Sequence, residues 1–148
     1  MDEATSNTSL TVVNLSSTGS KYCVNVVAPV YHFLQWVNSP NDNDLKVSGI
    51  EILKSIYVPA LPDETIEEHF YDVVLSESRK LYRQLVGKHD WSEVRAASLL
   101  PMCIMIKWTE IGNINAAYSR HAALERSTPG IAELTTKFKE AINNADKT

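Results

Sequence analysis

Residues 8–28 read TSLTVVNLSSTGSKYCVNVVA, and this stretch contains the clearest strand pattern of the chain. Its first part is rich in Thr and Val, and in its second part Tyr22, Val24 and Val26 alternate with the residues between them. A period of two is typical of a β-strand. Residues 16–20 (SSTGS) have the composition of a turn. We therefore predict an antiparallel hairpin, which must pack on helices or pair with another copy because isolated hairpins are marginally stable.

Beyond the hairpin, apolar residues recur at intervals of three and four, which is the spacing of amphipathic helices. The predicted helices cover residues 30–37, 50–57, 63–87, 90–99, 102–125 and 128–142. Gly87 is placed to end the third of them, and Asp90 with Glu93 resembles a capping box that opens the fourth. The pattern predicts a mainly α (α+β) fold, namely a helical bundle-like domain with a short N-terminal β-hairpin.

Length and composition fit an ordinary globular protein. The chain has 148 residues, of which 44% are hydrophobic and 22% are charged, so we expect residues 1–148 to form one domain, with residues 1–7 as a mobile tail. The acidic start differs from a secretory signal. Residues 99–106 form the most apolar run and are too short to span a bilayer. Cys23 and Cys103 have no metal-site spacing, and we expect buried, reduced thiols in a cytoplasmic protein with no membrane partner.

Charge is distributed unevenly along the chain. Residues 1–78 contain 11 acids and 3 bases, a balance of −8, whereas residues 79–148 contain 7 acids and 11 bases, a balance of +4. Three explanations fit this asymmetry: a surface that binds nucleic acid, complementary faces that meet in an assembly, or neutralisation of the two halves inside one fold.

Motifs for catalysis are missing from the sequence. There is no GxSxG, P-loop or GxGxxG motif, and the four histidines lack zinc-ligand spacing, so we assign no catalytic residue, no metal site and no cofactor. One alternative remains for an enzyme: Glu64, Glu68 and Asp72 lie on one face of a predicted helix with His69 nearby. Such a group fits a metal-dependent hydrolase, but the solvated acidic face of a helix near its N-terminus explains it at least as well, and we favour that structural interpretation.

Basic residues near the end of the same predicted helix form the most suggestive cluster. Arg79 and Arg83 are one turn apart, so their guanidinium groups reach the same side, and Tyr82 between them offers a surface for stacking. The candidate nucleic-acid-binding residues are Arg79, Lys80, Arg83, Lys88, Arg120 and Arg126. The competing interpretation is a solvated helix end whose arginines pair with Glu77 or with the acidic half of the chain.

These patterns favour a non-enzymatic structural or interaction protein that self-associates, such as a small coat or nucleoprotein-like subunit. Its expected partners are further copies of the chain, through the apolar run at 99–106, and nucleic acid bound through phosphates. The alternatives are the metal-dependent hydrolase described above and a monomeric adaptor that binds a partner protein.

Overall fold

The computed structural model describes residues 8–37, 45–56, 70–102, 104–128 and 130–146, so the predicted tail at 1–7 lies outside the described residues. The two N-terminal strands pair antiparallel, as their alternation predicts: β1 (Ser9–Leu15) lies against β2 (Lys21–Pro29). Their turn contains Gly19, whose positive φ of 73° suits glycine. The amide of Gly19 donates to the Ser16 carbonyl at 2.9 Å and closes the turn.

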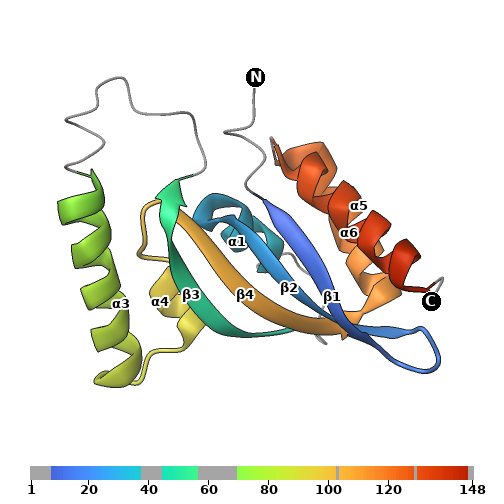
Figure 1. Ribbon diagram of the computed structural model, residues 1–148, viewed down its shortest axis with the longest axis horizontal. Helices are drawn as coiled ribbons and strands as arrows, with labels where there is room; N and C mark the ends of the chain where they lie inside the picture. The colour runs from blue at the N-terminus through green and yellow to red at the C-terminus, as the bar shows by residue number, and fades with distance from the viewer. Residues whose placement is uncertain (1–7, 38–44, 57–69, 103, 129, 147–148) are drawn as a thin grey trace.

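The predicted helical bundle is wrong, because the hairpin is half of a larger sheet. Two further strands, β3 (Lys46–Ile56) and β4 (Ile104–Asn113), complete a four-stranded antiparallel sheet with the order β1-β2-β4-β3. Strand β4 lies in the middle and pairs with β2 from Lys21↔Asn113 to Pro29↔Met105. The fold is therefore mixed α+β, with strands from both halves of the chain in one sheet (Figure 1).

A bulge explains why β3 resembles a helix in sequence. The register against β4 shifts between Ser48 and Glu51, and Gly49 between them has a φ of 65°. An extra residue in one strand reverses the alternation of its faces. Val47 and Ile52 therefore oppose Glu110 and Ile106 on the same face of the sheet. The apolar residues on either side of the bulge are therefore no longer two positions apart, and their spacing resembles that of a helix.

Strand β4 resembles a helix in sequence for another reason. Its inner face carries Ile106 and Trp108, followed by Glu110 and Gly112, and all four are buried. A glutamate and a glycine at core positions remove the apolar alternation on which strand prediction depends. The predicted helix at residues 102–125 is consequently a strand that ends at Asn113, followed by a helix.

The helices are α1 (Val30–Val37), a π-helical turn η2 (Phe70–Leu75), α3 (Ser76–Gly87), α4 (Glu93–Ala97), α5 (Ile114–Ser127) and α6 (Ile131–Asp146). The expected helix at 30–37 and the expected end at Gly87 are confirmed, and α6 covers most of the final predicted helix. The expected start of the long helix at Asp63 lies outside the described residues. None of the described helices is long and apolar enough to cross a membrane.

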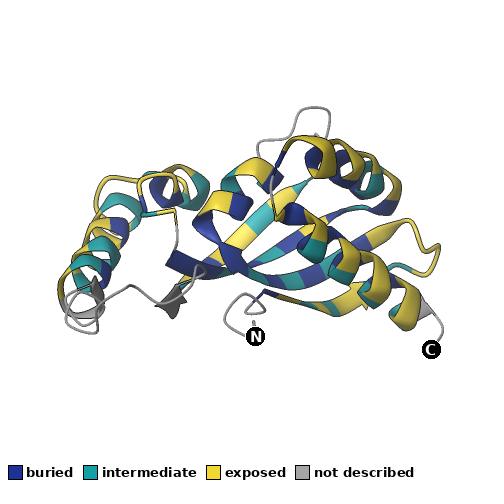
Figure 2. Cartoon of the chain, turned by 90° about the horizontal axis from the view of Figure 1, so that it is seen from above, coloured by how far each residue is buried: buried dark blue, intermediate teal, exposed yellow. Residues whose placement is uncertain are grey.

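Helices α1, α5 and α6 cover one face of the sheet, and α3 with α4 lies beside β3 (Figure 1). Buried residues concentrate along the strands in the middle of the molecule (Figure 2). In α3 only Tyr82 is buried among the side chains of the helix. The fold therefore has a densely packed end around α1, α5 and α6 and a thinner end where α3 meets the edge of the sheet.

Candidate nucleic-acid interface

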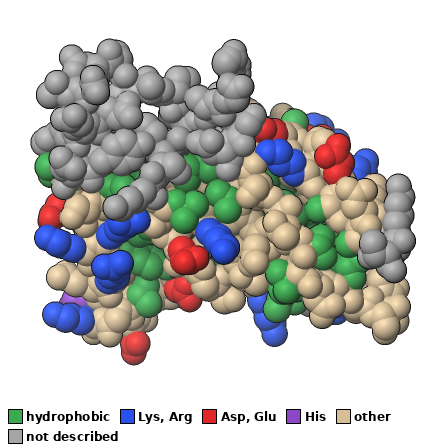
Figure 3. Space-filling model, viewed as in Figure 1, with side chains coloured by type: hydrophobic (Ala, Val, Ile, Leu, Met, Phe, Trp, Pro, Cys, Tyr) green, Lys and Arg blue, Asp and Glu red, His purple; other side chains and the backbone are tan. Residues whose placement is uncertain are grey.

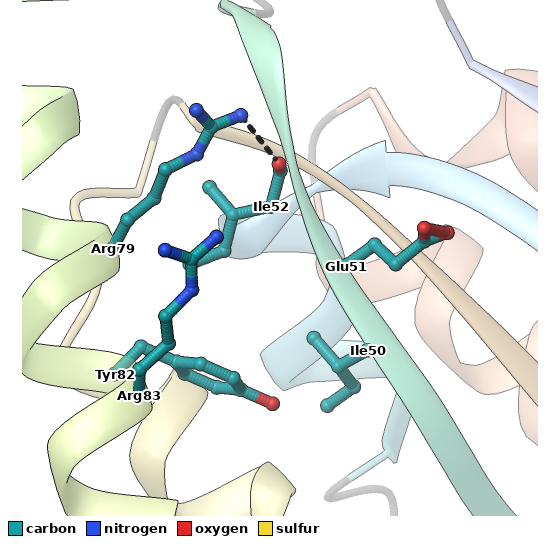
Figure 4. A pocket seen from close by; sticks show the side chains of 6 residues that line it. All are labelled: Ile50, Glu51, Ile52, Arg79, Tyr82 and Arg83. Carbon is teal, nitrogen blue, oxygen red and sulfur yellow. Dashed lines mark hydrogen bonds between the residues drawn. The ribbon is translucent and has the colours of Figure 1, made fainter.

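A groove of about 310 Å³ lies between α3 and β3, and it contains two of the predicted basic residues. Its lining comes from one face of α3 and from three consecutive residues of β3: Arg79, Tyr82, Arg83, Ile50, Glu51 and Ile52 (Figure 4). Among the described strands β3 pairs only with β4, so this groove follows an edge of the sheet.

The two arginines extend from α3 toward β3. The guanidinium of Arg79 donates from Nη2 to the carbonyl oxygen of Ile52 at 2.9 Å, and the Arg83 side chain is exposed beside it (Figure 4). Glu51 points to the other side of the strand, where it lies 4.0 Å from Lys107 (Figure 4). Within the described residues neither guanidinium forms an ion pair, so both positive charges are available to an anion in the groove.

The segment that contains α3 and α4 also binds the backbone of β3. The Ile50 amide donates to Glu93 Oε1 at 2.7 Å. Side chains of α3 and α4 therefore bind β3 twice, because Glu93 accepts from a backbone amide and Arg79 donates to the backbone carbonyl of Ile52. The predicted capping box at Asp90 and Glu93 is not formed, because Ser92 caps α4 by accepting from the Arg95 amide at 3.1 Å. Sequence alone carried no signal for the role of Glu93, since that role depends on β3 being a strand.

Tyr82 does not offer the stacking surface that the sequence favours. Its side chain is only 8% exposed and extends from the middle of α3 toward β3 (Figure 4). Burial raises the pKa of the Tyr82 hydroxyl, and the nearby Glu93 carboxylate raises it further. Tyr82 therefore stays protonated and belongs to the core of this end of the molecule.

The other basic residues of α3 lie at its surface. Lys80 pairs with Glu77 at 3.2 Å, with both side chains about two-thirds exposed, which is the local pairing that the sequence offered as an alternative. Lys88 follows the helix and is exposed. Figure 3 shows Lys and Arg side chains gathered over α3. An exposed pair such as Lys80–Glu77 contributes little to stability, so Lys80 remains accessible to other anions.

The remaining two predicted residues do not join this surface. Arg120 is 3% exposed, and its Nη2 lies 3.4 Å from Glu110 Oε2 in the core. Arg126 is exposed in the last turn of α5. Helix α5 lies at the opposite end of the molecule from α3 (Figure 1). Of the six predicted basic residues, the four in α3 and directly after it therefore lie on one surface, and Arg120 and Arg126 do not.

The acidic group of the hydrolase hypothesis falls almost entirely outside the described part of the chain. Glu64, Glu68 and His69 lie outside the described residues, and so does the side chain of Asp72. Among the described residues no three His, Cys, Asp or Glu side chains come together as metal ligands. Cys23 is an unpaired and only half-buried thiol, which differs from the expected burial, and Cys103 lies outside the described residues.

No protein-family model and no curated protein matches this chain. A functional assignment must therefore come from the chemistry of the grooves and surfaces themselves.

Proposed function

We propose that this protein is a non-enzymatic interaction protein that binds nucleic acid through its phosphates in the groove between α3 and β3. The observation that supports the proposal is the pair of arginines that line this groove and form no ion pair within the described residues. Guanidinium groups bind phosphate oxygens through two parallel hydrogen bonds. Arg83 is exposed for such a contact. Arg79 would give up its hydrogen bond to the Ile52 carbonyl oxygen and donate to a charged phosphate oxygen instead.

The proposed binding does not depend on base sequence. Phosphate contacts position a nucleic acid and carry no sequence information, whereas stacking and base-edge contacts supply specificity. Among the described residues that line the groove, Tyr82 is the aromatic one, and its ring is buried. Lys80 and Lys88 extend the positive surface along the helix. Unrelated single strands should therefore bind alike, with an affinity that falls steeply as salt rises.

Self-association is the second part of the proposal, in which the protein acts as a coat or nucleoprotein-like subunit. The apolar run at 99–106 supports it only at its start, because residues 104–106 are buried in β4. Leu99 and Met102 remain 53% and 46% exposed between α4 and β4. Exposed apolar side chains that lie close together in the chain are a feature of subunit interfaces.

Fluorescence anisotropy with two unrelated labelled single strands tests the nucleic-acid part. Substituting Arg79→Ala and Arg83→Ala together should weaken binding of both strands equally and flatten the logarithmic salt slope by about one unit for each phosphate that the protein no longer neutralises. A matched double variant, Lys21→Ala with Arg126→Ala, removes the same charge outside the groove and should retain the slope. If the two double variants weaken binding equally, only the net charge matters and the groove is not the site.

Size-exclusion chromatography with absorbance at 260 and 280 nm tests self-association. The full chain should elute as an oligomer whose size depends on concentration, and Leu99→Ser with Met102→Ser should shift it to the monomer. A chain that stays monomeric at every concentration, with and without nucleic acid, would favour the monomeric adaptor instead.

A further inference from the structure

A backbone carbonyl forms part of the wall of the α3–β3 groove. The carbonyl oxygen of Ile52 accepts from Arg79 Nη2 at 2.9 Å, so it points away from β4 and toward α3 (Figure 4). Among the described strands β3 pairs only with β4, so no described strand covers this edge. A carbonyl oxygen has two lone pairs, and a ligand in the groove therefore meets an acceptor directly beside the positive charges of Arg79 and Arg83.

The neighbouring backbone donor of β3 is already occupied. The alternation of a strand places the backbone groups of Ile50 and Ile52 at the same edge, and the Ile50 amide donates to Glu93 Oε1 at 2.7 Å. Glu93 is half-buried at the start of α4. This part of the edge consequently offers an acceptor at Ile52 and no open donor at Ile50, so it favours a ligand group that donates a hydrogen bond.

The buried arginine at the packed end offers no comparable site. Arg120 pairs at 3.4 Å with Glu110, which has no exposed surface. The same carboxylate accepts hydrogen bonds from the Tyr22 hydroxyl at 2.7 Å and from the indole nitrogens of Trp36 at 2.7 Å and Trp108 at 2.8 Å. A buried charge is tolerated when it is paired and its lone pairs are satisfied, so this cluster organises the core.

The histidine beside that arginine adds no positive charge. His121 is 4% exposed, and burial together with the charge of Arg120 lowers its pKa to about 3. Its ring is therefore neutral at pH 7. Between these two arginine sites, it is the α3–β3 groove that combines an accessible guanidinium with an open backbone acceptor.

We propose that the α3–β3 groove prefers single-stranded RNA to single-stranded DNA, because the Ile52 carbonyl oxygen accepts from a ribose 2′-hydroxyl while Arg79 and Arg83 bind the adjacent phosphate. This preference rests on the proposed phosphate binding and adds recognition of the sugar. When Arg79 turns to the phosphate, the Ile52 carbonyl loses its donor, and an acceptor left unpaired in a contact is unfavourable. RNA supplies a replacement donor on the sugar that carries the phosphate, whereas DNA has no hydroxyl there.

The preference concerns the sugar and leaves the base sequence unread, because every ribonucleotide has the 2′-hydroxyl. Glu51, the carboxylate among the lining side chains, points to the other side of β3 (Figure 4). It therefore does not compete with the Ile52 carbonyl for the hydroxyl.

Fluorescence anisotropy with the full chain and labelled strands of equal length tests the preference. Oligouridylate should bind about three- to tenfold more tightly than oligodeoxyuridylate, the net contribution of one hydrogen bond, and the two strands differ only at the 2′ position. 2′-Fluoro and 2′-O-methyl oligouridylate should bind as weakly as the deoxy strand, because neither has a hydroxyl to donate. The fluoro strand keeps a ribose-like sugar conformation, so it separates the hydroxyl from the sugar pucker.

Single variants separate the carbonyl from the arginines. Arg79→Ala and Arg83→Ala should each weaken the binding of both strands and keep the ratio of the two affinities, because the Ile52 carbonyl is retained. Arg126→Ala removes an exposed charge outside the groove and should change neither affinity by more than about twofold.

Nuclear magnetic resonance observes the carbonyl directly. The Ile52 carbonyl ¹³C signal, detected through the amide of Leu53, moves upfield when the oxygen loses a hydrogen bond. It should therefore lie further upfield in the complex with oligodeoxyuridylate than in the complex with oligouridylate. The Ile50 amide, which Glu93 binds, should give the same signal in both complexes.

Each of three outcomes contradicts the preference. Equal affinities for oligouridylate and oligodeoxyuridylate would mean that the 2′-hydroxyl is not recognised. Binding of the 2′-fluoro strand as tight as that of RNA would assign the preference to the sugar conformation, and its loss in Arg79→Ala would assign it to the guanidinium. Failure of both strands to bind at low salt would instead refute the proposed phosphate binding, so the two proposals fail in different ways.

Discussion

Arginines at the two ends of the molecule have opposite environments. At the packed end, Arg120 is enclosed by Glu110 and by aromatic rings, with its guanidinium 5.3 Å from the centre of the Trp36 ring. At the thin end, Arg83 is exposed and Arg79 contacts only a backbone carbonyl of an edge strand among its described hydrogen bonds. A paired, buried arginine organises the fold and its neighbours, whereas an exposed one is free to bind a ligand.

This difference in burial and pairing determines how substitutions at each end should affect the protein. Around Glu110 every polar group depends on several others, so removing one leaves unsatisfied groups in a water-free environment. Around the α3–β3 groove, solvent can replace what is removed. Substitutions at the packed end should therefore act on stability, and those at the thin end should act on binding.

The largest effect should follow Glu110→Gln. This change removes the Glu110 countercharge from the buried Arg120 guanidinium, and breaking a buried pair in this way costs about 3–5 kcal/mol of unfolding free energy. Urea denaturation measures the decrease. Glu51→Gln removes a carboxylate from the exposed pair with Lys107 and should change stability by less than about 0.5 kcal/mol. Equal decreases in unfolding free energy for Glu110→Gln and Glu51→Gln would contradict the proposed difference between the packed end and the thin end.

Two glycines give the next comparison. A Cβ at Gly112 would lie 3.0 Å from the Tyr22 hydroxyl oxygen, whereas a Cβ at Gly87 meets no atom within 4 Å. Gly112→Ala should push Tyr22 away from Glu110 and cost about 2 kcal/mol. Gly87→Ala at the end of α3 should be neutral or stabilise by up to about 1 kcal/mol. Thermal unfolding of both variants checks this, and a Gly112→Ala protein as stable as the parent would show that Tyr22 can move at no cost.

Acidification should weaken the packed end through His121. Its pKa is about 3 in the folded protein, against an ordinary value of 6.5. Between these values the unfolded chain takes up a proton that the folded protein does not, so stability falls as pH decreases below 6.5, by at most about 1.4 kcal/mol per pH unit. Above pH 6.5 this contribution to the pH dependence vanishes.

Urea unfolding at pH 7, 6 and 5 measures this slope, with His121→Phe as the control. The variant should lack the part of the slope that belongs to His121. If the stability of both proteins decreases in parallel over this range, the titrating group is elsewhere in the chain.

The smallest effect separates the two groove arginines. Arg79→Ala removes the donor to the Ile52 carbonyl and should cost about 1 kcal/mol, because the site is half-buried and water replaces part of the bond. Arg83→Ala removes an exposed side chain and should change stability by less than about 0.5 kcal/mol. Chemical denaturation compares the stability of the two variants, and both should bind nucleic acid more weakly than the parent protein. A larger destabilisation by Arg83→Ala would mean that Arg83 is the structural residue of the pair.

Local features of the sequence were sufficient for the hairpin, for α1, for the end of α3 at Gly87 and for much of α6. Each is marked by residues a few positions apart: alternation with a turn, an apolar stripe, or a terminating glycine. The candidate binding site was predicted in part, because Arg79 and Arg83 share a helix and their common direction follows from helical geometry.

Tertiary structure alone decided the rest. Strands β3 and β4 depend on neighbours distant in the chain, and their patterns were hidden by a bulge at Gly49 and by Glu110 and Gly112 at core positions. Whether an arginine is buried or exposed, as in Arg120 and Arg83, depends on which carboxylate the fold places beside it. Sequence periodicity reports the local geometry of one element, whereas burial and charge pairing are set by elements that meet only in three dimensions.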